Sequence, residues 1–169
     1  MNQYRKQLSE VLKRAMIGAL AGCALAGAPA VATPGSGFTP STISNGHYSA
    51  LDVKSDKTEK WDLLVRSKDD TDVAVDQLTV IAGGQSGWHK HPAPIFVTIV
   101  SGEIVWIDGG DPLCTPHTYH TGDSFIEQAN RVHLVRNTSG SEAVFTAVRL
   151  APTGAAVRID ADEPNNCSF

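Results

Sequence analysis

The sequence lacks most of what helical, membrane-spanning or nucleic-acid-binding proteins need. It has only 2 methionines in 169 residues, no internal repeat, no heptad pattern, and no apolar run after Ala32 that could cross a bilayer. Basic clusters are also missing, and 14 Lys and Arg stand against 18 Asp and Glu. An acidic chain without a basic patch argues against nucleic acids and anionic membrane surfaces as partners.

Turn-forming residues are abundant instead. The chain has 15 Gly and 9 Pro, with 41% apolar and 19% charged residues, which is an ordinary globular composition for one domain. Short apolar or alternating segments recur between turn signals, whereas helical periodicity is absent. These segments are 61–66, 73–82, 95–102, 103–110, 123–127, 132–136, 143–150 and 156–160. The pattern predicts an all-β sandwich or barrel.

Three local features refine this prediction. Residues 33–60 are rich in turn formers, so we expect a loop-rich segment with one short strand near 38–43. The alternation in 73–82 slips in phase near Asp76. The runs on either side of Ser101-Gly102 suggest a hairpin.

The first 32 residues have the pattern of an export signal. Four basic residues precede an apolar segment that ends in the A-x-A cleavage candidates 28–30 and 30–32. We therefore expect a signal peptide over 1–32 and a secreted, periplasmic or envelope protein. The alternatives are an uncleaved anchor and a lipoprotein acylated at Cys23, because Leu20–Cys23 resembles a bacterial lipobox. Cleavage would leave a net charge of −7.

The cysteines agree with export. Without Cys23, an even pair remains, Cys114 and Cys167, and no CxxC redox motif is present. A disulfide between them would close a loop of more than fifty residues. The chain-entropy model gives about 4 kcal/mol for such a loop. The bridge would tie the tail, 161–169, to the body, and the alternative is two buried free thiols.

His89 and His91 raise the main functional question. Residues two apart on a strand face the same side, so both rings can reach one metal ion. A single histidine is more often a surface or core residue than a ligand. The other histidines are His47, His117, His120 and His133.

Two stretches match the sequence motifs of the cupin superfamily. The first motif, G-x5-H-x-H-x3,4-E-x6-G, fits the spacing of Gly83, His89, His91 and Gly102. The second, G-x5-P-x-G-x2-H-x3-N, fits that of Gly122, His133 and Asn137. The chain therefore resembles the small exported single-domain cupins of bacteria.

This resemblance implies a cupin double-stranded β-helix, or jelly-roll barrel, over 61–160. It also implies that a divalent transition metal is bound by His89, His91 and His133, without distinguishing Fe, Zn, Ni, Mn or Cu. The expected partner is a small-molecule ligand or substrate, and the resemblance allows a homodimer.

Two positions depart from the motifs. The first motif's glutamate falls at Ile95, which cannot bind a metal and which we expect to form an apolar wall of the barrel interior. The Pro-x-Gly of the second motif is replaced by 128–130, a turn variant in which Asn130 tolerates the left-handed conformation. A site of three histidines would leave positions for water or substrate.

Four other side chains are candidates for the pocket. Glu127 ends a strand beside the second motif and is a candidate substitute ligand or base, with a solvent-facing strand end as the alternative. Trp88 and Phe96 are expected near the barrel end, where they either pack in the core or line a pocket. His120 lies between the motifs, in a segment that often borders the barrel mouth in cupins, and an exposed loop is the alternative.

Three functions remain in view. The first is a metalloenzyme acting on a small organic molecule. The second is a non-catalytic ligand-binding module, and the third is a structural envelope protein without metal. The fold does not choose among them. The sequence offers no clear general base beside the three histidines, so no reaction is predicted.

Overall fold

The computed structural model describes residues 34–167, and all regular secondary structure in that range is β-strand. This confirms the predicted all-β class. The strands are β1 (Ser36–Tyr48), β2 (Asp52–Lys54), β3 (Leu64–Arg66), β4 (Thr71–Gln85), β5 (His89–Lys90), β6 (Ile95–Ser101), β7 (Glu103–Asp108), β8 (Pro116–His120), β9 (Ser124–Glu127), β10 (His133–Arg136), β11 (Ala143–Pro152) and β12 (Ile159–Asp160). The expected signal peptide and Cys23 lie outside the described residues. No helix that could span a membrane is found between residues 34 and 167.

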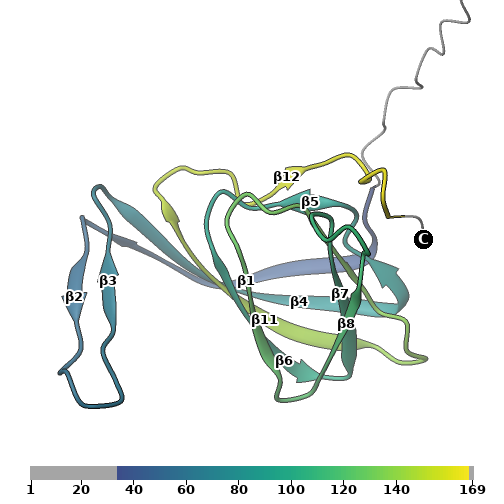
Figure 1. The fold of residues 1–169 in the computed structure, drawn as a ribbon, viewed down its shortest axis with the longest axis horizontal. Coiled ribbons are helices and arrows are strands. Elements are labelled where there is room, and N and C mark those ends of the chain that lie inside the picture. The colour runs from purple at the N-terminus through teal and green to yellow at the C-terminus, as the bar shows by residue number, and fades with distance from the viewer. Residues whose placement is uncertain (1–33, 168–169) are drawn as a thin grey trace, which may run out of the picture.

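The strands form two antiparallel layers of a nearly closed barrel. One layer has the order β1-β4-β11-β6-β9, and the other has the order β12-β5-β10-β7-β8. The layers join where Arg136 of β10 pairs with Gln85 of β4. Figure 1 shows these layers around a common interior, the arrangement of a jelly roll. Strands β2 and β3 pair only with each other and form an arm that stands away from the barrel.

The core fills the barrel interior. Inward-facing side chains of both layers are almost fully buried, as the alternation of a half-buried strand requires. The largest cluster consists of Val80, Ile95, Val97, Ile99, Ile104, Val135, Ala143, Phe145 and Ala147. A second cluster surrounds Trp88 and contains both cysteines of the disulfide between Cys114 and Cys167. The predicted disulfide is therefore confirmed, and it fixes the tail beside the loop after β7.

The structure differs from the sequence prediction at β1. A strand of 13 residues replaces the expected short one. It is polar and contains Pro40, but it pairs only with β4 and so lies at an edge of its layer. Proline is tolerated at an edge because no ladder hydrogen bond is lost there.

The predicted hairpin at Ser101-Gly102 is wrong. Strand β6 pairs with β11 and β9, whereas β7 pairs with β10 and β8, so the turn carries the chain from one layer to the other. Gly102 has a φ of 75°, and a Cβ there would lie 2.7 Å from the carbonyl oxygen of Glu142. This close approach is why the crossover needs glycine.

Candidate metal and ligand site

Three histidines meet at one end of the barrel. His89 lies on β5 and His133 on β10, and the two are direct cross-strand partners. His91 follows β5, so its ring comes from the same short segment as that of His89. One ring nitrogen from each histidine lies within 4.8 Å of the others, an arrangement that could hold a metal ion. The sequence-predicted trio is thus brought together.

The backbone orients all three rings in the same way. Each Nδ1 lies within hydrogen-bonding distance of a carbonyl oxygen: Gly87 for His89 at 2.9 Å, Val157 for His91 at 2.6 Å, and Arg131 for His133 at 2.9 Å. Because a carbonyl only accepts, each Nδ1 carries a proton and donates it. The neutral rings then direct the lone pair of Nε2 toward the common centre, as metal-ligating histidines do.

Glu127 supplies a carboxylate at the same centre. Its Oε1 lies 3.2 Å from Nε2 of His133, and its Oε2 lies 3.4 Å from Nε2 of His91. Glu127 is only 4% exposed, and its direct partner across the β6–β9 ladder is Ile95. The chain therefore has its carboxylate one strand away from the position that the first motif assigns to glutamate.

The contact between His133 and Glu127 is not a well-aligned hydrogen bond. Nε2 of His133 is fully buried and lacks a hydrogen-bond partner, although Oε1 of Glu127 is 3.2 Å away. With Nδ1 as the donor, a neutral His133 would place a lone pair against a carboxylate oxygen. Two acceptors at this separation are stable only with a cation between them or on one of them, which means a metal ion or a proton.

Burial and mutual contact shift the pKa values of His89, His133 and Glu127. Burial, together with the positive charges of His133 and Arg158, lowers the pKa of His89 to about 3. Burial also acts to lower the pKa of His133, but Glu127 outweighs it and raises the pKa above 6.5. Burial acts to raise the pKa of Glu127, but His133 and His91 outweigh it and lower the pKa below its usual range. His89 is therefore neutral and Glu127 is ionised at neutral pH.

A cavity of about 570 Å³ opens beside the histidines. Its polar lining includes His89, His91 and Glu127 at one end, with Asp76 and Arg149 farther along β4 and β11. Its apolar lining includes Phe38, Leu78, Ile95, Val135 and Phe145. Ile95 is 3% exposed and forms part of this wall. The size is typical of a site for a small organic ligand.

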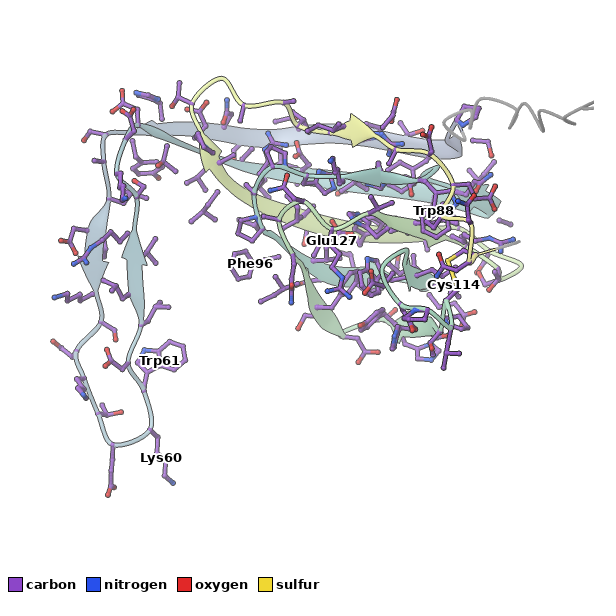
Figure 2. The ribbon with its side chains drawn as sticks, turned by 45° about the horizontal axis from the view of Figure 1, so that its top comes forward. Lys60, Trp61, Trp88, Phe96, Cys114 and Glu127 are labelled. Atoms are coloured by element: carbon purple, nitrogen blue, oxygen red, sulfur yellow. A yellow bond between two sulfur atoms is a disulfide. The ribbon has the colours of Figure 1, made fainter. Side chains whose placement is uncertain are left out.

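The other candidate residues lie outside this cavity. Trp88 is 1% exposed and packs in the cluster that contains the disulfide. Phe96 is 43% exposed and faces outward, because it follows the inward-facing Ile95 on the same strand. His120 lies on β8, where its Nδ1 is 3.4 Å from a carboxylate oxygen of Glu103 on the surface. Figure 2 shows Trp88 and Cys114 near one end of the barrel, with Phe96 on its outer side.

Sequence reasoning missed Asp76 and Arg149. The register of β4 against β11 is unbroken from Val80 to Thr71, so the apparent phase slip is not a bulge. Ala74, Asp76 and Val80 share the inward face, and Asp76 is a charged residue inside the barrel. The interrupted apolar alternation was the available signal for it.

These features define a jelly-roll barrel with a cluster of potential metal ligands at one end. Residues 77–149 match the family description "Cupin domain". The chain therefore carries a cupin domain over these residues.

Several solved structures are similar to this chain in fold. A cupin-2 domain protein from Rhodospirillum rubrum has a TM-score of 0.52 and 13% identity, over 78% of this chain and 70% of that one. The polyketide cyclase RemF from Streptomyces resistomycificus has a TM-score of 0.46 and 11% identity, over 73% and 77%. The DMSP lyase DddQ from Ruegeria pomeroyi DSS-3 has a TM-score of 0.45 and 20% identity, over 50% and 41%. At these identities the similarity shows the fold alone. No curated protein matches the sequence significantly.

Proposed function

We propose that this protein is an exported cupin that binds one divalent transition metal through His89, His91 and His133, with Glu127 as a fourth ligand. The adjacent cavity would bind or convert a small organic molecule. The observation that carries the proposal is the convergence of three oriented Nε2 atoms and one buried carboxylate, with Nε2 of His133 left without a hydrogen-bond partner.

The distances support this ligand set. Two donor atoms that each lie about 2.1 Å from one ion are about 3.0 Å apart at an octahedral angle and about 3.4 Å apart at a tetrahedral one. The separations of 3.2 and 3.4 Å between Glu127 and the two histidines fall in this range. Imidazole and carboxylate together suit Fe, Zn, Ni, Mn or Cu. When bound, such an ion would supply Lewis-acid or redox chemistry, while the chain's own residues orient the ligand and exclude water.

The disulfide supports the exported part of the proposal. Bridges such as Cys114–Cys167 persist in oxidising compartments and are rare in the cytosol. The predicted leader over 1–32 gives the same location, so we propose secretion or residence in the cell envelope.

Metal content after purification from the native host tests the ligand set. His89→Ala and His133→Ala should each lose most of one equivalent of metal while keeping the β-rich circular dichroism spectrum. His120→Ala is the matched control, since that surface histidine lies outside the cavity, and it should keep its metal. Unchanged metal in both site variants would contradict the proposal. A wild-type protein that takes up none of the five metals would favour a non-catalytic module instead.

Moving the carboxylate from position 127 to position 95 tests the role of Glu127. Glu127→Gln should weaken metal binding at least tenfold, measured by competition with a chelator. Adding Ile95→Glu to that variant should restore binding, because the two positions are direct cross-strand partners with Cβ atoms about 5 Å apart. Unchanged affinity in Glu127→Gln would show that the three histidines act without this carboxylate. Loss without restoration would show that Ile95 does not point at the metal.

A further inference from the structure

The same cavity contains a second polar site, centred on Arg149. Arg149 of β11 pairs with Ile95 of β6, and Ile95 pairs with Glu127 of β9. Directly paired residues on neighbouring strands project to the same face of a sheet, here the barrel interior. With strands about 4.8 Å apart, the backbones of Arg149 and Glu127 are about 10 Å apart. Ile95 separates them, so an apolar wall connects two polar ends.

Asp76 holds Arg149 in place, and part of the guanidinium remains available to a ligand. Its Nη1 lies 3.4 Å from Oδ2 of Asp76, and Oδ1 of Asp76 accepts a hydrogen bond of 2.6 Å from Thr42. The side chains of Arg149 and Asp76 are each only 13% exposed. Within residues 34–167, Asp76 is the hydrogen-bond acceptor that the guanidinium reaches. A guanidinium has five N–H donors, so the edge away from Asp76 keeps donors available in the cavity wall.

The charges of the lining also favour an anion. Two arginines, Arg149 and Arg158, stand against three carboxylates, Asp76, Glu127 and Asp160. With neutral imidazoles the lining is one unit negative, and a divalent metal makes it one unit positive. A ligand with a single negative charge would then leave the cavity neutral, which a low-dielectric interior favours.

We propose that the cavity takes a small organic monocarboxylate with an apolar body. The carboxylate binds the free edge of Arg149 as a bidentate partner, the body lies against Phe38, Ile95 and Phe145, and the far end reaches His89 and His91. Asp76 and Thr42 are positioning residues that orient the guanidinium. The far end of this assignment rests on the proposed metal function, whereas the contact with Arg149 does not.

Calorimetric titration with a matched pair of probes tests this inference. The probes are 3-phenylpropanoate and its primary amide, which share shape and apolar body but differ in charge. Each is titrated into zinc-loaded protein and into protein treated with a chelator. The acid should bind at least tenfold more tightly than the amide, because it makes charge-assisted hydrogen bonds to arginine. Zinc should strengthen binding of the acid and leave the amide nearly unchanged.

The variants are chosen to keep the fold. Arg149→Gln alone would leave Asp76 buried without its cation, so the main variant is Asp76→Asn with Arg149→Gln, which removes both charges together. It should lose the preference for the acid. Arg149→Lys should keep only part of it, since lysine lacks the planar fork. Arg158→Gln is the comparison, because it removes a cation of the same cavity that pairs with Asp160. It changes the net charge of the lining but removes no donor to the carboxylate, so it should keep most of the preference.

The outcomes separate this inference from the proposed function. Equal binding of acid and amide, no binding of the acid, or a preference that survives the double variant would each overturn the inference. Loss of the preference in Arg158→Gln alone would also overturn it, by placing the anion at Arg158. If zinc does not bind but the acid preference depends on Arg149, the inference stands and the metal function falls. If zinc binds but acid and amide bind equally, the metal function stands and the inference about Arg149 falls.

Discussion

Acid should destabilise the metal-free protein through His89 before the carboxylates begin to titrate. The His89 side chain is buried, and burial together with the charges of His133 and Arg158 lowers its pKa to about 3. In the unfolded chain the same imidazole has a pKa of about 6.5. As the pH falls below 6.5, the unfolded state therefore takes up a proton that the folded state does not, and the free energy of unfolding falls.

The size of this loss of stability follows from the pH range in which, of these site residues, only His89 titrates differently in the folded and unfolded states. His133 has a raised pKa, so below about pH 6.5 it is protonated in both states and adds no slope. Glu127 has a lowered pKa, and the stability it contributes is present above about pH 4.5 and lost as the pH falls further. Between pH 6.5 and 4.5, a group that titrates only when unfolded costs about 2 kcal/mol of stability.

Urea unfolding with a chelator present, followed by tryptophan fluorescence, measures this cost. The buried Trp88 makes the signal sensitive to loss of the core. His89→Gln is the comparison, because glutamine does not titrate, and its stability should fall by about 2 kcal/mol less than that of the parent over the same window. If parent and variant show the same pH dependence, His89 is not held neutral by the fold and the reasoning about its burial is wrong.

Two further predictions concern the frame around the site. Reduction of Cys114–Cys167 should lower the melting temperature by removing about 4 kcal/mol of loop-closure stabilisation while the β-sheet circular dichroism signal persists, and an unchanged melting temperature would contradict this. Asn137→Ala should cost about 2–3 kcal/mol in urea unfolding, because the buried amide donates to the carbonyls of Val80 and Ser141. Thr138→Ala, an exposed neighbour, is the control, and an equal effect in both variants would refute the role of the amide.

The fold class and the three histidines could be predicted from the sequence because both depend on short-range patterns. Period-two alternation specifies strands, and the spacing of His89 and His91 specifies a shared face. His133 could be identified from the second motif, because the spacing of that motif's residues is also local in the sequence. The disulfide followed from counting cysteines after the expected loss of Cys23.

The remaining parts of the site depend on register between distant strands. Arg149 and Asp76 are 73 residues apart in sequence, and no local pattern brings them together. Glu127 is adjacent to the motif turn, but its direction depends on its pairing with Ile95. The wrong hairpin at Ser101-Gly102 has the same origin, since a turn signal does not say whether the two strands pair or part into different layers.

Val157, whose carbonyl oxygen orients the His91 ring, is synthesised late. Val157 accepts the hydrogen bond from His91 across a separation of 66 residues, and β12 adds to the edge of β5 just beyond it. A ribosome therefore releases His89 and His91 well before the residue that orients His91 has been made. The finished ligand geometry forms only after residue 157 and β12 have been made. If the proposed metal binds, its capture in that geometry would be coupled to completion of the barrel.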